Sequence, residues 1–198
     1  MSLLERFSGT GSVGNVFREN GWGMFSLDIG PNAHPTLLKD ILHVGRSDPP
    51  QHVDAVWTSP LCTHFSRART RANTPRNFVD ADSLVAKARE LISWYPDVLF
   101  FIENPLGLLK DRAVIQGIPR YTVDYCQYKD EWWPRLYIKR TNLWSNCSFN
   151  PRPLCNSQTC SCRHIGKHLG YCHSKRTHNL YTIPPGLVQS VYECVAQS

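Results

Sequence analysis

A glycine-rich turn between two apolar segments near the N-terminus constrains the fold most strongly. Residues 3–7 have the length and composition of a short strand, and residues 22–27 read as a second strand that ends at Asp28. The intervening glycines follow the pattern G-x-G-x-x-G: Gly9, Gly11 and Gly14. A helix is expected to start at residues 15–17. This arrangement predicts a strand–turn–helix–strand unit.

The same turn is suited to an adenosine-containing cofactor. Glycines let the backbone approach a ligand closely, and a helix N-terminus offers free N–H groups. Asp28, at the tip of the second strand, is placed to accept hydrogen bonds from ribose hydroxyls. Asp40, at a strand tip or in a short helix, would hold the adenine amino group or is a plain surface acid. The spacing does not separate a dinucleotide from S-adenosylmethionine.

A cysteine follows the next predicted strand. Residues 53–57 read as a short buried strand, and a Ser-Pro loop then leads to Cys62. Open α/β sheets bind ligands just past the carboxyl ends of their strands. Arg67, Arg69 and Arg71 come next, and if they lie near the thiol they favour the nucleophilic thiolate. The alternative is a small buried cysteine followed by a solvated basic run.

A carboxylate and an amide end a further strand. The continuous apolar run at residues 98–102 is typical of a buried parallel strand, and Glu103, Asn104 and Pro105 follow it. The segment before it reads as a scaffold helix capped at residues 82–83. Glutamate is seldom buried without a partner, so Glu103 is a site candidate, with a capping or ion-paired Glu as the alternative.

Charge is distributed unevenly along the chain. Residues 1–131 contain 14 Lys or Arg and 15 Asp or Glu, whereas residues 132–192 contain 8 Lys or Arg and no Asp or Glu. Such a stretch predicts a face for a polyanion such as nucleic acid, or else a solvated basic surface. Trp132, Trp133 and Trp144 lie among these basic residues, where they would stack on bases or pack in a core.

The cysteines crowd the basic part of the chain. Five of the eight lie between residues 147 and 172, among His164, His168 and His173. No apolar run has the roughly 20 residues of a membrane span or the character of an export signal, so we expect a soluble intracellular protein. In that setting the crowding favours metal over disulfides, with free thiols as the alternative. The expected zinc ligands are Cys155, Cys160, Cys162 and His168, with His164 and Cys172 as rivals.

The ordered motifs resemble the DNA cytosine-5 methyltransferase family over residues 3–146. The segment Phe7-Ser8-Gly9-Thr10-Gly11 resembles its cofactor loop, and Ser59-Pro60-Leu61-Cys62 resembles its Pro-Pro-Cys nucleophile loop. Glu103-Asn104-Pro105 resembles its Glu-Asn-Val motif. Residues 125–128 and 139–144 are similar to small, divergent members encoded by phages and viruses.

The chain also departs from the family pattern. Leu61 replaces the second proline, and no clear Gln-x-Arg-x-Arg motif is present, so we assign that motif's role to Lys139 and Arg140. Residues 147–178 stand in place of a large target-recognition domain. The late Gly-Asn motif of the family is absent, and residues 183–185 echo that region only weakly.

The resemblance implies an α/β fold: a Rossmann-like, mostly parallel sheet with helices on both faces. The Cys/His-rich stretch adds a small insertion that we expect to bind zinc. The expected parts are a catalytic domain at residues 1–146, a recognition region at 147–178 and a C-terminal helical segment at 179–198 that packs back. Residues 121–128 are expected to form a strand, and residues 136–138 and 142–144 a hairpin-like pair. The implied S-adenosylmethionine site comprises Phe7, Ser8, Gly9, Thr10, Gly11, Gly14, Asp28, Ile29, Asp40, Ile41, Ser59 and Pro60.

The resemblance further implies methyl transfer to carbon 5 of a cytosine flipped out of double-stranded DNA, through a covalent adduct on Cys62. Glu103 and Asn104 would assist, together with Lys139 and Arg140. Three alternatives stay open: the same chemistry on tRNA or a free nucleotide, a binder with a decayed site, and a nicotinamide-dependent enzyme. The last would explain the glycines but not the pairing of Cys62 with Glu103.

Overall fold

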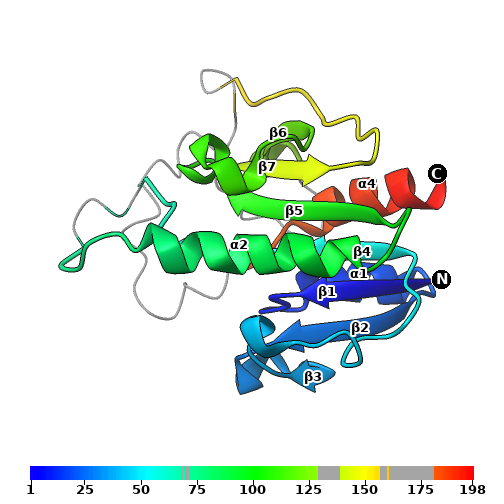
Figure 1. Cartoon of the computed structure of the whole chain (residues 1–198). Helices are drawn as coiled ribbons and strands as arrows, with labels where there is room; N and C mark the ends of the chain where they lie inside the picture. The colour runs from blue at the N-terminus through cyan, green and yellow to red at the C-terminus, as the bar shows by residue number, and fades with distance from the viewer. Residues whose placement is uncertain (68, 70–71, 129–138, 157–159, 161–180) are drawn as a thin grey trace.

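A seven-stranded sheet forms the centre of the described part of the chain, which comprises residues 1–67, 69, 72–128, 139–156, 160 and 181–198 of a computed structural model (Figure 1). The strands are β1 (Ser2–Arg6), β2 (Gly23–Asp28), β3 (Leu37–Leu38), β4 (Ala55–Thr58), β5 (Leu99–Pro105), β6 (Arg120–Asp124) and β7 (Arg140–Ser145). The α-helices are α1 (Ser12–Glu19), α2 (Phe78–Ser93) and α4 (Pro185–Ala196).

The strand order is β3-β2-β1-β4-β5-β7-β6. Strand β1 pairs in parallel with β2 and β4, β4 pairs in parallel with β5, and β7 is antiparallel to both β5 and β6. Only β7 therefore runs against the others in this sheet. The chain changes direction across the sheet between β1 and β4, which is where open α/β sheets form their ligand crevice.

Helices cover both faces of the sheet (Figure 1). Helix α2 packs on one face through Ala81 and Val85, in a core with Val56 and Ile102. Helices α1 and α4 pack on the other face and against each other, because their apolar stripes share one core with β1 and β5. This architecture confirms the predicted mostly parallel α/β fold. No helix in the part described is both long and apolar enough to span a membrane.

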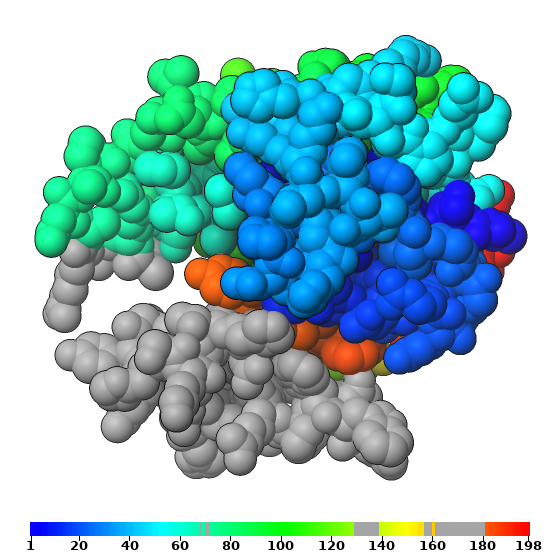
Figure 2. All heavy atoms as spheres, turned by 90° about the horizontal axis from the view of Figure 1, so that it is seen from below, coloured from blue at the N-terminus to red at the C-terminus, as the bar shows by residue number. Residues whose placement is uncertain are grey.

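The segment that enters α4 returns to the N-terminal part of the chain. In Figure 2 these orange residues lie against the blue N-terminal segments. The Ile183 backbone N–H donates a hydrogen bond of 3.1 Å to Ser12 Oγ at the start of α1. Phe17 of α1 and Tyr192 of α4 meet edge to face, with ring centroids 5.5 Å apart. The C-terminal helix expected within residues 179–198 is thus observed over Pro185–Ala196, next to α1.

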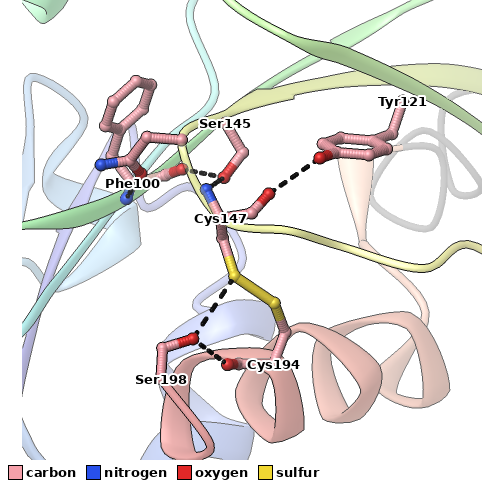
Figure 3. The surroundings of a disulfide bond; sticks show 7 residues. Phe100, Tyr121, Ser145, Cys147, Cys194 and Ser198 are labelled. Carbon is pink, nitrogen blue, oxygen red and sulfur yellow. Dashed lines mark hydrogen bonds between the residues drawn. A yellow bond between two sulfur atoms is a disulfide. The ribbon is translucent and has the colours of Figure 1, made fainter.

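A disulfide joins Cys147, just after β7, to Cys194 of α4 (Figure 3). The backbone around Cys147 is fixed as well: its N–H donates to Ser145 Oγ at 2.9 Å, and its carbonyl accepts from the Tyr121 hydroxyl at 2.9 Å. The expectation of metal rather than disulfides is therefore wrong for Cys147. The sequence pattern could not show it, because the partner lies 47 residues further on and approaches only when α4 packs.

The predicted start of helix α2 is wrong for a local reason. Helix α2 starts at Phe78 rather than after residues 82–83, because the Asn77 side chain accepts the N-capping hydrogen bond from the Asp80 N–H. Asp82 instead forms an ion pair with Arg112. Of the two alternatives for Asp40, a strand tip or a short helix, the structure shows the second: Asp40 caps the 3₁₀ turn Ile41–His43, and the third strand is Leu37–Leu38 before it.

The predicted hairpin around residues 139–141 is also wrong. Arg140 and Thr141 already belong to β7, where they pair with Asp124 and Val123 of β6. Residues 142–144 do form a strand, within β7, but that strand lies between β5 and β6. Residues 136–138 lie outside the described residues.

Candidate active site

The parallel strands bring the predicted site residues to one edge of the sheet. Strands β1, β2, β4 and β5 all end at this edge, and the antiparallel β7 begins there. The glycine loop follows β1, the loop of Cys62 follows β4, and Glu103 and Asn104 lie near the end of β5. Lys139 reaches the same edge because it immediately precedes β7.

The cysteine loop is held by its neighbour β5. Asn104 is buried, and its Nδ2 donates a hydrogen bond of 2.8 Å to the Pro60 carbonyl. The carbonyl of Cys62 accepts hydrogen bonds from the N–H groups of Phe65, at 3.0 Å, and Ser66, at 2.8 Å. Phe65 is fully buried and anchors the far end of the turn. The thiol is thus presented by a fixed turn rather than by an open loop.

Gly107 completes this support. The Leu108 N–H donates to the Phe65 carbonyl at 2.9 Å, so the segment after β5 lies directly against the cysteine loop. A Cβ atom at Gly107 would lie 2.4 Å from the same carbonyl oxygen. Only glycine fits this contact without displacing backbone, a requirement that the sequence pattern did not reveal.

Glu103 is buried beside two further side chains at this edge. The residue is only 5% exposed, and its Oε1 accepts a hydrogen bond of 3.1 Å from the Tyr125 hydroxyl. Lys139 Nζ lies 4.8 Å from the centre of the Tyr125 ring. Sequence reasoning missed Tyr125, because an aromatic residue at a strand end is ordinary core material until its hydroxyl is seen to meet a carboxylate.

The environment of Cys62 disfavours its thiolate. Burial of the thiol raises its pKa, the nearby Glu103 carboxylate raises it further, and the Lys139 ammonium opposes both effects. The expectation that the following arginines promote the thiolate is wrong for those in the described part. Arg67 is exposed, and Arg69 donates instead to the carbonyl of Pro75. Arg71 lies outside the described residues.

The glycine loop adopts left-handed backbone conformations. Phe7 has φ 55°, Gly9 has φ 49°, and Gly11, the residue before α1, has φ 66°. The Asp28 carboxylate holds this loop from the end of β2: it accepts from the Gly9 N–H at 2.9 Å and from the Gly30 N–H at 2.7 Å. Asp28 thus lies beside the loop, as the sequence predicts.

A second carboxylate, Glu5, supports the loop from below. It is buried in β1, and its Oε2 accepts a hydrogen bond of 3.2 Å from the Gly14 N–H in the first turn of α1. Burial raises the pKa of Glu5 to about 7. A Cβ atom at Gly14 would lie 2.5 Å from this oxygen, which explains the third glycine of the motif. Sequence reasoning missed Glu5 because it stands inside a predicted strand.

The residues at this loop fit an adenosine-containing cofactor. Ser8 Oγ is buried and has no hydrogen-bond partner in the described part of the chain, so a ligand atom would satisfy it. Each Asp28 oxygen retains a lone pair for a ribose hydroxyl. Ile29 is 66% exposed beside it and offers an apolar surface for a base.

Other members of the predicted cofactor set have structural partners. Asp40 accepts from the Leu42 N–H at 3.0 Å and Ser59 Oγ from Trp57 Nε1 at 2.9 Å, while Ile41 is buried. Thr10 is half-buried in the glycine loop.

Arg140 is held apart from this group. Its guanidinium forms two hydrogen bonds, of 2.9 and 2.8 Å, with the carboxylate of Asp124, which is fully buried at the end of β6. Of the two basic residues assigned to the missing arginine motif, the structure therefore brings Lys139 toward Cys62 and pairs Arg140 with Asp124.

A cluster of sulfur atoms lies next to this ion pair. The Sγ atoms of Cys126, Cys155 and Cys160 lie within 4.8 Å of one another. Two of these belong to the predicted zinc ligands, whereas Cys162 and His168 lie outside the described residues. Cys126 was missed because it lies far back in the sequence, in the 3₁₀ turn Tyr125–Gln127 after β6.

Comparison with known proteins identifies one informative relative. No protein-family model matches the chain. A curated protein of Frog virus 3 (isolate Goorha), named "Probable DNA (cytosine-5)-methyltransferase", is 31% identical over 175 residues, which span 81% of this chain and 78% of that protein.

Among solved structures, the S. pombe Dnmt2 methyltransferase is 16% identical, with a TM-score of 0.48 over 89% of this chain and 60% of its own. A SAM-dependent methyltransferase from Archaeoglobus fulgidus is 11% identical, with a TM-score of 0.46 over 73% of this chain and 85% of its own. Both TM-scores are below 0.5, so the family assignment depends on the viral relative.

Proposed function

Because the chain belongs to the DNA (cytosine-5) methyltransferase family, we propose that it transfers a methyl group from S-adenosylmethionine to carbon 5 of cytosine in DNA. The observation that carries this proposal is the convergence of Cys62, Glu103 and Lys139 at the sheet edge that also bears the glycine loop. A nucleophile, a carboxyl group and a cation then lie close together at the edge that bears the proposed cofactor loop.

These residue types match the difficulty of the reaction. Carbon 5 of cytosine is a weak nucleophile, and addition of the Cys62 thiolate to carbon 6 makes carbon 5 enamine-like. Glu103 hydrogen-bonds ring N3 and the exocyclic amine and stabilises the adduct as charge develops. After methyl transfer a base removes the carbon 5 proton, the bond between carbon 6 and Cys62 breaks, and the thiolate leaves.

The electrostatics couple activation of the thiol to arrival of the base. The Glu103 carboxylate raises the pKa of Cys62, so it opposes the thiolate while no cytosine is present. When Glu103 shares a proton with ring N3, its negative charge is partly neutralised and this opposition weakens. The Lys139 ammonium then stabilises the thiolate. Cys62 therefore ionises most readily with cytosine in place.

Two neighbours act through these groups. The Tyr125 hydroxyl orients the Glu103 carboxylate through their hydrogen bond, so Tyr125 is a positioning residue. Asn104 fixes the carbonyl of Pro60 and hence the turn that presents Cys62. Arg140 anchors the start of β7, next to Lys139, through its ion pair with Asp124.

The glycine loop and the end of β2 are proposed to bind S-adenosylmethionine. When bound, S-adenosylmethionine supplies the methyl group. Ser8 and Asp28 provide polar contacts, and the glycines allow close approach of the backbone. The remaining proposed members are Phe7, Thr10, Ile29, Asp40, Ile41, Ser59 and Pro60.

The proposed nucleic-acid substrate is double-stranded DNA. A cytosine inside a duplex is out of reach of Cys62, so the base must flip out at a cost of a few kcal/mol. The basic stretch at residues 132–192 would contact phosphates meanwhile, and its described cations are Lys139, Arg140 and Arg152. We also propose a structural Zn²⁺ with the ligands predicted from the sequence, Cys155, Cys160, Cys162 and His168. Cys126 lies beside the first two of these and competes for one of the four positions.

Transfer of tritiated methyl groups tests the proposal. Wild type and Cys62→Ala are offered duplex DNA, tRNA and dCMP separately with labelled S-adenosylmethionine. We expect label in DNA that disappears in Cys62→Ala. Label in tRNA or dCMP would keep the chemistry and replace the substrate, and wild-type turnover by Cys62→Ala would refute the covalent mechanism.

A further inference from the structure

We propose that Cys126, Cys155 and Cys160 bind one Zn²⁺ ion, and that this ion fixes the strand ends that position Glu103 and Lys139. The metal site stands on the geometry alone, whereas its effect on turnover rests on the proposed function. The site lies outside the catalytic group, next to the end of β6. The proposed metal is not a cofactor of the methyl transfer.

The spacing of the three sulfur atoms suits a thiophilic metal. Their Sγ atoms lie within 4.8 Å of one another. Zinc–sulfur bonds of about 2.3 Å in a tetrahedron place sulfur atoms roughly 3.8 Å apart, so the thiols need to approach by no more than about 1 Å. Three thiolates leave one position of a tetrahedral ion for a fourth ligand. Binding replaces the thiol protons, which are released to solvent.

Contacts of the Arg152 side chain and of the Cys160 backbone bring the three cysteines together before any metal binds. Arg152 Nη1 donates to the Gln127 carbonyl at 2.7 Å, and its guanidinium lies 5.0 Å from the Tyr128 ring centre. These contacts return the chain after β7 to the turn that contains Cys126. The Cys160 N–H donates to the Asn156 carbonyl at 3.0 Å, so Cys160 lies next to the residue that follows Cys155.

The surroundings suit a negatively charged metal centre. Zinc with three thiolates has a net charge of −1, and the guanidinium of Arg140 lies close enough to Cys126 and Cys155 to interact with both electrostatically. Gln127 Nε2 donates to Cys126 Sγ at 3.8 Å, the kind of outer contact that stabilises a metal-bound thiolate. Cys126 is buried, so water has little access to its sulfur.

Two short paths connect this site to the catalytic group. Cys126 directly follows Tyr125, whose hydroxyl holds Glu103. The Cys155 N–H donates to Asp124 Oδ2 at 2.9 Å, and the same carboxylate binds Arg140, the neighbour of Lys139. A metal that joins Cys126 to Cys155 therefore restrains both the partner of Glu103 and the start of β7.

Metal content of the full chain tests the site without any turnover. Protein purified without chelators is analysed for metals and then titrated with Zn²⁺, alongside Cys126→Ser and Cys155→Ser. We expect about one zinc per wild-type chain and, since each variant removes a ligand, at least a tenfold loss of affinity in both. Cys62→Ser, which alters a free cysteine outside the cluster, is the matched control and should keep its zinc.

Two results would overturn the metal site. One is reduced wild-type protein that neither contains nor takes up zinc; the other is full zinc content in Cys126→Ser. Thiol titration accompanies the metal analysis, because a disulfide between two of the three cysteines would also refute the site. Cobalt substitution adds a spectroscopic check, since thiolate-bound tetrahedral Co²⁺ absorbs visibly and the signal should vanish in Cys155→Ser.

Steady-state kinetics test the coupling. In Cys155→Ala we expect kcat for methyl transfer to fall about tenfold, while the Kd for S-adenosylmethionine stays within twofold because the glycine loop is remote from the cluster. Cys155→His keeps a metal ligand and should restore zinc and turnover together. An unchanged kcat in zinc-free protein would refute the coupling. A wild type that binds zinc but methylates nothing would instead refute the proposed function alone.

Discussion

The glycine loop after β1 and the cysteine loop after β4 follow neighbouring strands at one edge of the sheet but are held by different means. Two carboxylates, Asp28 and Glu5, accept hydrogen bonds from backbone N–H groups of the glycine motif. The cysteine loop depends on the neutral amide of Asn104, on buried Phe65 and on the close approach of Gly107. Changes of pH should therefore alter the stability of the glycine loop, whereas substitutions that add atoms at close contacts should disturb the cysteine loop.

Replacing Glu103 by Gln should have the largest effect. The variant loses the carboxyl group that we propose to act on ring N3, so we expect kcat/KM for DNA methylation to fall by about 10² to 10⁴ with the melting temperature nearly unchanged. Methyl-transfer kinetics and thermal unfolding measure the two quantities. Glu193→Gln, an exposed change in α4, is the control. Activity close to wild type in Glu103→Gln would remove this carboxylate from the chemistry.

Glu5 should make stability depend on pH. Its pKa is about 4.5 in the unfolded chain and about 7 in the folded protein, because burial disfavours the ionised form. Its contribution is fully present below pH 4.5 and is lost as pH rises through 7. Since one pKa unit corresponds to about 1.4 kcal/mol, the loss is roughly 3 kcal/mol.

Urea unfolding between pH 5 and 8 measures this dependence. In Glu5→Gln the side chain still offers an oxygen to the Gly14 N–H but does not titrate. As the pH rises from 5 to 8, the unfolding free energy of the variant should therefore fall by roughly 3 kcal/mol less than that of the wild type. An identical pH profile in the variant and the wild type would show that the glycine loop is not held by a titrating group.

Gly107→Ala should damage the cysteine loop through shape alone. The added methyl group meets the Phe65 carbonyl, and the resulting backbone shift should cost about 1–3 kcal/mol and lower kcat with little change in affinity for S-adenosylmethionine. Urea unfolding and binding measurements separate these effects. Gly45→Ala is the matched control, because its added methyl group meets only ordinary contacts. Equal stabilities of the two variants would contradict the close packing.

Asp28→Asn should give the smallest effect. A single carboxamide oxygen can serve only one of the Gly9 and Gly30 N–H groups, so we expect a loss of about 1 kcal/mol in stability. Affinity for S-adenosylmethionine should fall about tenfold, as measured by calorimetry, because ribose hydroxyls also lose an acceptor. A fall in kcat at unchanged affinity for S-adenosylmethionine would show that Asp28 supports the chemical step rather than the cofactor loop.

The sequence predicts the strand ends better than the contacts between them. The approximate positions of the parallel strands along the chain, and of Cys62, Glu103 and the glycines near their ends, follow from local patterns of apolar residues, turns and motif spacing, which each act over about ten residues. Tyr125, Glu5 and Gly107 could not be found this way, because their roles depend on which strands become neighbours. Cys126 illustrates the same limit, since it meets Cys155 only after β7 inserts between β5 and β6.

The electrostatic expectation for Cys62 failed for a related reason. Arginines adjacent in sequence were expected to act on the thiol, whereas the charges that reach it come from β5 and from the start of β7. Sequence proximity is a poor guide to electrostatic proximity at a strand end, because the loop that follows leads the chain away from the sheet. The decisive cation, Lys139, stands more than seventy residues from the cysteine it serves.

The disulfide between Cys147 and Cys194 closes the intervening chain into a covalent ring. Cys147 follows the end of β7, so the ring is closed at the edge of the sheet opposite the proposed catalytic residues. In the loop-entropy description, closing 47 residues stabilises the fold by about 4 kcal/mol, and doubling the length of the ring changes this by only about 0.6 kcal/mol. The length of this segment is thus nearly free to vary. Insertions between Cys160 and α4 should therefore cost little stability, provided that Cys155, Cys160 and α4 keep their contacts.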